Sequence, residues 1–413
     1  MKDQIILYRE DPVQLEKLYR SNKSFFRKEF NKAYPEIKGS QLSQFWHERL
    51  NFENEEVIRG SSRDLIFVIV ASLISGIIAK LPAIVRIEEE FFYPRNIGFI
   101  VFPALAAYFI WKNKLSAGKT AVIAGVFLTA AVYINFLPNV SESDTFILSC
   151  IHLLFFLWAI LGYAYVGAKN TYTKRLDFLK YNGDLLVMSA LICIAGGIMT
   201  GITIGLFSII GLDIENFYFE YIVVFALPAV PILGTWLTQS NPQLVGKVSP
   251  VIARIFSPLV LVMLVIYLVS MVFSGKDPYS DREFLLIFNI LLIGVMAIIF
   301  FSIAGSSGAK RSRLEMLTLL LLSIVSIIVN GIALSAILFR ISEWGITPNR
   351  IAVLGANILI LINLIMVTGQ LLKVVSNKSD LDGVGKTIAH YLPVYIIWVI
   401  LVTFTFPLIF GFQ

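Results

Sequence analysis

Charged residues are scarce in this sequence. Asp, Glu, Lys and Arg account for 15% of its 413 residues, whereas apolar residues account for 57%. A soluble chain of this length carries charge at about a quarter of its positions, because its surface must be hydrated. The composition therefore excludes an ordinary soluble globular protein and favours a membrane protein.

Cysteine and histidine are also scarce, with two and three copies. Cys150 and Cys193 both lie in apolar runs, so the sequence predicts neither a disulfide framework nor thiol catalysis. Three histidines without neighbouring cysteines do not make an ordinary zinc site. The motifs of phosphate-binding loops, dinucleotide-binding turns and zinc peptidases are missing as well. We therefore predict no metal, no cofactor and no catalytic residue.

What the sequence has instead is long apolar runs. From Leu65 onward they recur in blocks of roughly 20 residues, the length of helix that crosses the hydrocarbon core of a bilayer. A helix satisfies its own backbone hydrogen bonds in lipid, so we predict an all-α, polytopic membrane protein. The expected spans are eleven: Leu65–Val85, Ile97–Trp111, Thr120–Leu137, Thr145–Ala168, Asp184–Gly211, Phe217–Leu237, Pro250–Ser274, Phe284–Ala304, Leu314–Phe339, Ile351–Val375 and Tyr391–Phe412.

The basic residues alternate between connections, which predicts the orientation of the chain. One set of connections holds fifteen Lys/Arg and five Asp/Glu, and the other holds six Lys/Arg and twelve Asp/Glu. Basic connections stay in the cytoplasm, so the N-terminus is expected inside and the C-terminus outside. The net charge of +6 is then a matter of topology, and no nucleic-acid partner is predicted.

Residues 1–64 form a segment of different character from the membrane domain at 65–413. They are rich in charge of both signs and have helical periodicity. Asp11, Pro12 and Gln14 are typical of a helix start, and apolar stripes run along residues 26–34 and 42–50. We expect three short amphipathic helices in a cytoplasmic bundle, which either binds a protein partner or only stabilises the protein.

The predicted spans hold few ionisable residues, and any such residue is a functional candidate. No Asp or Glu falls in the middle of a span, which disfavours carboxylate-coupled ion transport. Lys80 lies near the outer end of the first span, where its side chain can extend to the interface. His152 lies well inside the fourth span and is either a ligand or proton relay, or a hydrogen-bonding partner of a neighbouring helix. The asparagines of the spans and Gln370 are expected to hold helices together.

Two spans have irregular sequences. Gly197, Gly201 and Gly205 are spaced four apart, which predicts a face on which another helix packs closely. Pro228 and Pro231 fall in mid-span, where each removes a backbone hydrogen bond. This pair predicts either a broken helix that lines a substrate cavity or a packed kink, and the sequence does not choose between them.

The stretch RISEWGITPNR, Arg340–Arg350, separates two apolar runs. Gly345 is typical of a helix end, Thr347 of a helix cap and Pro348 of a first helical position, while Trp344 suits the membrane interface. The polar residues that this reading leaves over are Arg340, Glu343 and Arg350. They either clamp the turn or bind an anionic headgroup or substrate at the outer surface.

The same stretch, followed by an apolar span, resembles the signature of a bacterial polytopic membrane family, the domain of unknown function numbered four-one-five-three. The similar pattern is R-I-x-x-aromatic-G-apolar-T-P-N-R, with Trp344 at the aromatic position. The resemblance covers the membrane part, and residues 1–64 are similar to a helical extension of members from the Bacteroidetes group. It implies a multi-pass protein of the bacterial inner membrane, and it implies no activity, substrate or catalytic residue.

Three functions fit these features. The first, which the prevalence of transport among multi-span proteins favours, is a transporter or permease-like protein for a small molecule or lipid, with a cavity near Pro228, Pro231 and His152. The second is a membrane scaffold or signalling protein that recruits a partner through residues 1–64. The third is a lipid-linked transferase that uses acids of the external loops, and those acids are Glu88, Glu89, Glu90, Asp277, Asp281 and Glu283.

Overall fold

The computed structural model describes residues 1–51, 62–138, 143–167, 170–241, 248–273, 279, 282–304 and 312–412. Every regular element in these ranges is a helix. The chain divides into two compact units, Met1–Arg59 and Gly60–Gln413, so the division lies a few residues before the one expected at residue 64.

The first unit is a small bundle with a core of its own. Its helices are α1 (Lys2–Leu7), α2 (Pro12–Ser21), α3 (Lys23–Ile37) and α4 (Gln41–Asn51). The Asp11 carboxylate caps α2 by accepting hydrogen bonds from the backbone N–H groups of Val13 and Gln14, at 3.0 and 3.1 Å. The three expected helices correspond to α2, α3 and α4, and α1 is an addition. The buried apolar side chains are Ile5, Leu15, Phe26, Phe30, Ala33, Ile37, Trp46 and Leu50.

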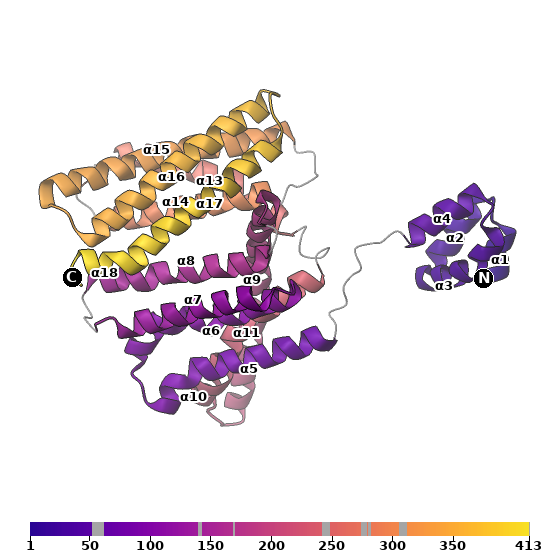
Figure 1. Ribbon diagram of the computed structural model, residues 1–413, viewed down its shortest axis with the longest axis horizontal. Coiled ribbons are helices and arrows are strands. Elements are labelled where there is room, and N and C mark those ends of the chain that lie inside the picture. Colours follow the sequence, from indigo (N-terminus) through magenta and orange to yellow (C-terminus); the bar gives the residue numbers. More distant parts are fainter. Residues whose placement is uncertain are drawn as a thin grey trace. The chain divides into compact units, whose positions relative to one another are not determined.

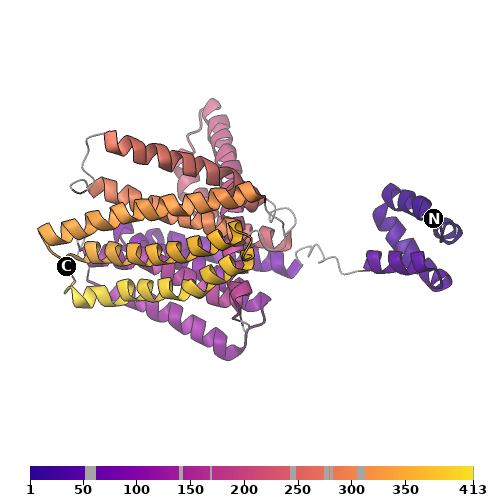
Figure 2. The same ribbon diagram turned by 90° about the horizontal axis from the view of Figure 1, so that it is seen from above.

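The second unit consists of long helices, many of which lie alongside one another (Figures 1 and 2). In chain order they are α5 (Ser62–Val85), α6 (Glu89–Lys112), α7 (Ala117–Phe136), α8 (Asp144–Val166), α9 (Tyr172–Ile209), α10 (Glu215–Phe217), the π-helix η1 (Tyr218–Val223), α11 (Val224–Ser240), α13 (Val248–Phe273), α14 (Arg282–Ala304), α15 (Arg313–Trp344), α16 (Pro348–Val375), α17 (Leu381–Ile400), the π-helix η2 (Leu401–Thr405) and α18 (Phe406–Ile409).

Nine helical stretches in the described part of the chain are long and apolar enough to cross a membrane. Each of the eleven expected spans falls on a helix. The two expected spans outside these nine are Ile97–Trp111, within α6, and Pro250–Ser274, which follows α13 almost to its end. The protein is therefore an all-helical, multi-pass membrane protein, while the number of eleven and the orientation remain predictions.

Several helices are longer than the apolar runs that predicted them. Helix α9 begins at Tyr172 rather than Asp184, because the Thr171 hydroxyl caps it by accepting a hydrogen bond from the Lys174 N–H at 3.4 Å. Helix α17 begins at Leu381 rather than Tyr391. The added turns are polar, so hydropathy does not reveal them, and they lie on the side predicted to be cytoplasmic.

The last span is irregular, and its neighbours compensate for the irregularity. Pro407 has no N–H to donate, which leaves the Thr403 carbonyl of η2 without its helical partner. The Ser149 hydroxyl of α8 donates to that carbonyl at 2.9 Å, and the Tyr133 hydroxyl of α7 lies 3.3 Å from it. These bonds attach the end of the chain to two other membrane helices.

Asparagine side chains connect α14, α15 and α16 inside the membrane unit. The Asn357 amide of α16 donates to the Asn289 side chain of α14 at 2.7 Å, and the Asn330 amide of α15 donates to the Asn357 backbone carbonyl at 3.2 Å. Asn330 and Asn357 are fully buried. The sequence predicted this role for the asparagines, and hydrogen bonds between side chains are a common way to hold membrane helices together.

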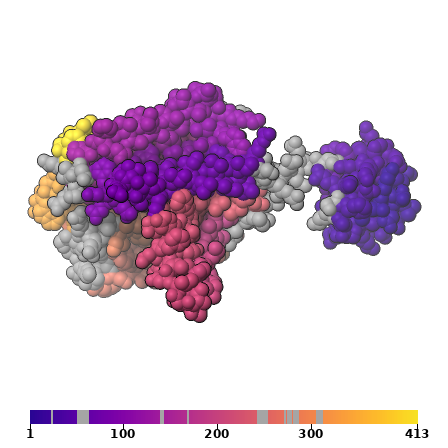
Figure 3. Space-filling view, turned by 90° about the horizontal axis from the view of Figure 1, so that it is seen from below, coloured from indigo at the N-terminus to yellow at the C-terminus, as the bar shows by residue number. Residues whose placement is uncertain are grey.

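The second half of α9 differs from the other spans because it lacks neighbours in the described part of the chain. None of its most apolar stretch is buried, although the first half packs against α11 and α17. Figure 3 shows the region around residues 200–225 projecting from the surface of this unit. Such an apolar helix is suited to lipid, which covers it without any partner helix.

Candidate functional site

A hollow opens between the end of α16 and the start of α17, on the side predicted to be cytoplasmic. We call it the α16–α17 hollow. Its volume is about 440 Å³, which is in the range of small-molecule sites. The lining side chains include an ammonium, an imidazole, an amide and two hydroxyls, but no carboxylate. The lining residues are Met366, Gln370, Gly383, Lys386, Thr387, His390 and Tyr391.

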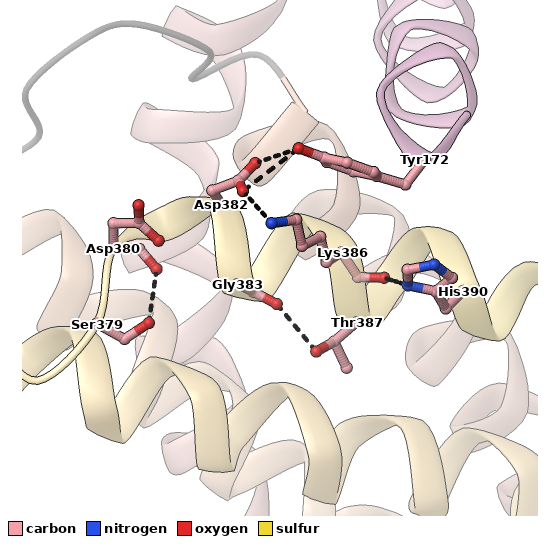
Figure 4. Close-up of polar contacts among 8 residues, drawn as sticks. All are labelled: Tyr172, Ser379, Asp380, Asp382, Gly383, Lys386, Thr387 and His390. Carbon is pink, nitrogen blue, oxygen red and sulfur yellow. Dashed lines mark hydrogen bonds and ion pairs between the residues drawn. The ribbon is translucent and has the colours of Figure 1, made fainter.

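The α17 part of the lining has helical spacing. Lys386 and Thr387 stand three and four residues after Gly383 and four and three residues before His390, so the four share one face of α17. Thr387 and His390 each bond the carbonyl one turn earlier, with Oγ1 donating to Gly383 O at 3.0 Å and Nδ1 lying 2.8 Å from Lys386 O (Figure 4). The second ring nitrogen of His390 is left to point away from the helix axis.

An ion pair lies at the rim of the hollow. The Lys386 ammonium is 2.8 Å from the Asp382 carboxylate, which also accepts a hydrogen bond from the Tyr172 hydroxyl of α9 at 3.2 Å (Figure 4). The ammonium is 5.1 Å from the centre of the Tyr172 ring, within cation–π range. Both charged side chains are about half exposed. The pair therefore connects α9 to α17 in a place that a solute can reach.

Further along the same two helices lies a set of buried polar atoms, which we call the buried polar row: Asn363, Tyr395 and Trp398. Both side-chain amide atoms of Asn363, the Tyr395 hydroxyl and the Trp398 indole nitrogen are buried and have no hydrogen-bond partner among the described residues. Asn363 is fully buried in the middle of α16. A buried polar atom without a partner costs about 1–3 kcal/mol, so native proteins keep few of them.

The buried polar row continues from the hollow. Tyr391, Tyr395 and Trp398 stand at positions i, i+4 and i+7 of α17, which places them on one face. The rings of Tyr391 and Tyr395 are in edge contact, with centroids 5.1 Å apart. Trp398 packs directly on Gly355 of α16, where a Cβ atom would clash with the indole. This face of α17 therefore faces α16 from the rim of the hollow to beyond mid-span.

A proline-dependent contact fixes the position of α17. Pro393 cannot donate to the Ala389 carbonyl, which would otherwise lack a partner inside the helix. The Arg175 guanidinium of α9 donates to that carbonyl at 3.1 Å. Arg175 and Tyr172 thus both attach the start of α9 to the first half of α17, beside the hollow.

The residues of the Arg340–Arg350 stretch are brought together at the turn between α15 and α16. Gly345 ends α15 with a φ of +77°, and the Thr347 hydroxyl caps α16 by accepting from the Arg350 N–H at 3.3 Å. The Arg350 guanidinium donates to the carbonyls of Trp344 and Gly345 at 2.8 and 2.6 Å. These contacts agree with the predicted helix punctuation and favour the turn-clamping role.

The two arginines flank one aromatic ring. The guanidinium carbons of Arg340 and Arg350 lie 5.5 and 5.8 Å from the centre of the Trp344 ring. Arg340 is buried and donates to the Tyr279 carbonyl at 2.9 Å. Glu343 is exposed, and its carboxylate forms no ion pair with the described residues. The expected alternative, an anionic ligand held by both arginines, stays a prediction.

The structure places His152 and the two mid-span prolines on helices with different neighbours. The Nδ1 atom of His152 lies 2.9 Å from the Leu148 carbonyl, so among the described residues this histidine bonds its own helix α8 and no neighbouring helix. Helix α11 runs without interruption through Pro228 and Pro231 and packs mainly on α5 and α9. The irregular segment is η1, directly before α11. This arrangement favours the packed kink over the broken helix.

The irregular segment η1 is held by Lys80. Its ammonium donates to the Glu220 carbonyl at 3.0 Å and pairs with the Glu220 carboxylate at 2.8 Å. It also lies 4.3 Å from the centre of the Tyr221 ring. A wide helical turn leaves carbonyls that need outside donors, and Lys80 supplies one. Its side chain is 12% exposed, so it is buried in a contact rather than extended to the interface.

The glycines expected to pack against another helix lie on the exposed second half of α9. A Cβ atom on Gly197, Gly201 or Gly205 would meet no other atom within 4 Å in the described part of the chain. The prediction that another helix packs closely on these glycines is therefore wrong for the described part of the chain. Among the external acids, Glu88, Glu89 and Glu90 are exposed at the start of α6, and Asp277, Asp281 and the side chain of Glu283 lie outside the described residues.

The sequence did not single out the α16–α17 hollow. Gln370 was expected to hold helices together, and Lys386 was considered only for its charge. The available signal was the polar spacing of Gly383, Lys386, Thr387 and His390, ahead of the last apolar run. No protein-family model, no curated protein and no solved structure matches this chain. The family resemblance of the Arg340–Arg350 stretch therefore remains a prediction.

Proposed function

We propose that this protein is a permease-like transporter of a small polar molecule, preferentially an anion, which enters at the α16–α17 hollow. The lining of the hollow offers the Lys386 ammonium and the His390 ring, and no lining residue is acidic. Both residues present donors to an anion, and a charge-assisted bond to Lys386 is the stronger of the two. The Asp382 carboxylate at the rim is the partner of Lys386, so an anion would compete with it for the ammonium.

The observation that carries this proposal is Asn363. It is fully buried at mid-span, it has two donors and an acceptor, and none of them is used within the described chain. The Asn357 amide on the same helix is by contrast fully engaged. A solute that descends from the hollow between α16 and α17 would provide Asn363, Tyr395 and Trp398 with the partners that the protein does not.

The test is a transport assay that identifies the substrate by itself. The full chain is reconstituted into liposomes loaded with a polar metabolite extract, and the solutes that leave are identified by mass spectrometry. We expect selective efflux of one class of solute through the unmodified protein. Asn363→Leu should lower that efflux at least tenfold, because a leucine offers no hydrogen bond along the path.

The matched control is Ile362→Leu, at the neighbouring position on the lipid-facing side of α16, where the side chain is 44% exposed. This variant should transport as the unmodified protein does. Correctly inserted protein that releases no solute selectively would count against transport. Efflux that Asn363→Leu leaves unchanged would place the path elsewhere, with the region around Pro228 and Pro231 as the next place to examine.

A second function is favoured by the separate first unit. Residues 1–51 have their own aromatic core, with Tyr19, Phe26 and Trp46 in mutual ring contact at 5.3–5.7 Å. Such a unit suits a scaffold or signalling protein that recruits a cytoplasmic partner. Deleting residues 1–60 should then remove a co-purifying protein while efflux persists. If no protein is lost on deletion, this second function is wrong.

A further inference from the structure

The outer face of α3 in the first unit is basic. Arg27, Lys28, Lys32 and Lys38 are all exposed. Residues 28, 31, 35 and 38 recur at intervals of three or four, and residue 27 stands four before residue 31, so all five follow one side of the helix, opposite the buried Phe26 and Phe30. The acids of α3, Glu29 and Glu36, stand at its flanks. On this side, Arg27 and Lys28 lie in the first half of the helix and Lys38 follows its last residue, with the uncharged Asn31 and Pro35 between them and no acid.

Most of this charge is not neutralised by the protein. Lys32 is paired with Glu29 at 2.7 Å, and Glu36 is occupied by Lys2 at 2.6 Å. Arg27, Lys28 and Lys38 form no ion pair with the described residues. An ordinary solvated surface mixes both signs, whereas this face presents one sign only. We call the three unpaired residues the basic face of α3.

An exposed aromatic side chain borders the basic face. Phe25 is 47% exposed, and it stands three residues before Lys28 and seven before Lys32, on the same side of α3. A large apolar ring beside a row of cations is the arrangement of helices that lie in the membrane interface, where the ring enters the boundary of the acyl chains.

We infer that the basic face of α3, with Phe25, binds the surface of an anionic phospholipid bilayer. The first apolar helix, α5, begins at Ser62, eleven positions after the last residue of α4, so a membrane is always within reach of this unit. Tethering makes the binding intramolecular, and a weak affinity is then enough. Each Lys or Arg near an anionic leaflet adds about fivefold to the binding constant. The first unit would thus be held flat on the leaflet at low salt and be released at high salt.

The test uses the full chain in bilayer nanodiscs. Cys150 and Cys193 are replaced by alanine, and a nitroxide is attached through Pro35→Cys on the basic face or through Gln4→Cys on the exposed side of α1. The collision rate of each label with a water-soluble nickel complex reports its exposure to water. In discs with phosphatidylglycerol the Pro35→Cys label should collide several-fold less often than in phosphatidylcholine discs, and the Gln4→Cys label should not change.

Two triple variants assign the effect to the basic face. Arg27→Gln, Lys28→Gln and Lys38→Gln together should restore the collision rate. The matched variant, with Arg9→Gln, Lys17→Gln and Arg20→Gln, removes the same charge from other exposed positions and should leave the label protected. Added salt in the unmodified protein should release the label too, which tests the inference without any substitution.

Three results would overturn the inference. Equal collision rates in both lipids would mean that anionic lipid is not bound. Equal release by both triple variants would mean that general charge acts and not this face. Protection that persists in detergent without phospholipid would mean that protein covers the face, and the occupant would then be a partner protein instead of a membrane.

Discussion

Two asparagines of one helix have opposite surroundings. Asn357 and Asn363 are both fully buried in α16. Asn357 faces α14 and α15 and is hydrogen-bonded to Asn289, Asn330 and the Val353 carbonyl. Asn363 has no partner in the described chain. One helix thus carries two residues of the same type: Asn357 connects helices, and the hydrogen-bonding groups of Asn363 are unused among the described residues.

We propose that the difference separates structural polar groups from functional ones. A satisfied amide contributes to packing, and its loss leaves its neighbours without partners. An unsatisfied buried amide costs stability, and such a cost persists where it serves a function. Tyr395 and Trp398 share the face of α17 on which Trp398 packs against Gly355 of α16, and the unused atoms of Asn363 lie on α16. The α14–α15–α16 contact is a packing contact, and the α16–α17 contact is where we propose that a solute binds.

The largest expected effect is the contrast between Asn357→Leu and Asn363→Leu. The first substitution leaves the Asn289 side-chain oxygen without its donor and should lower the free energy of unfolding by about 2 kcal/mol, whereas the second removes an unsatisfied amide and should raise it by about 1 kcal/mol. Steric trapping in micelles measures both values. If both substitutions destabilise to the same degree, Asn363 is a packing residue and the comparison fails.

A second prediction concerns how tightly the two contacts are packed. Gly355→Ala introduces a methyl group where the Trp398 indole already lies, so it should cost about 1–3 kcal/mol through overpacking. Gly369→Ala, on the same helix with open space around it, is the control and should be neutral or slightly stabilising. Replacing Trp398 with leucine should rescue Gly355→Ala. A harmless Gly355→Ala would mean that α16 and α17 are not in close contact.

Hydropathy reports apolar length, so it predicts the apolar parts of the helices and not their polar turns. Each expected apolar run falls on a helix of the described chain, because the hydrocarbon thickness sets the length of such runs. They missed the polar first turns of α9 and α17, whose start is set by the cap at Thr171 and by tertiary contacts such as that of Arg175 with the Ala389 carbonyl. The hollow lies between the end of α16 and the polar turns of α17, so the candidate site was missed with those turns.

Contacts between residues far apart in the chain could not be predicted from the sequence either. Nothing in the spacing of residues tells that Lys80 meets Glu220, 140 positions away, or that Asn357 has partners and Asn363 has none. The turn at Gly345 and Thr347 was predictable because its cause is local. The glycines of α9 were expected to pack, but small residues reveal only that close approach is allowed and not that a neighbour exists.

Substitutions that change the charge at the rim of the hollow should change the rate of efflux less than Asn363→Leu does. Asp382→Asn releases the Lys386 ammonium from its rim pair, so efflux of anions should rise about two- to threefold, and Lys386→Gln should lower it by a similar factor. Both charged groups are half exposed, which limits the change because solvent screens them. Initial rates measured for the solute class found by mass spectrometry give these factors. If Asp382→Asn lowers the efflux and Lys386→Gln raises it, the solute is a cation. If neither substitution changes the efflux, the pair lies outside the path.

The smallest effect is expected where polar groups are paired in water, in the first unit. The hydrogen bond from Arg20, at 2.9 Å, holds the pKa of the Glu16 carboxyl below its ordinary value, with a further contribution from Arg49. A carboxyl with a lowered pKa in the folded state stabilises that state above its unfolded pKa. The contribution is lost as pH falls through the lower, folded value. Acidification should therefore loosen this unit slightly, and Glu16→Gln should weaken that pH dependence. The ¹⁹F resonance of 5-fluorotryptophan at Trp46, assigned with Trp46→Phe, follows the change. A pH dependence that Glu16→Gln leaves intact would assign it to another pair, with Glu29 and Lys32 the next to test.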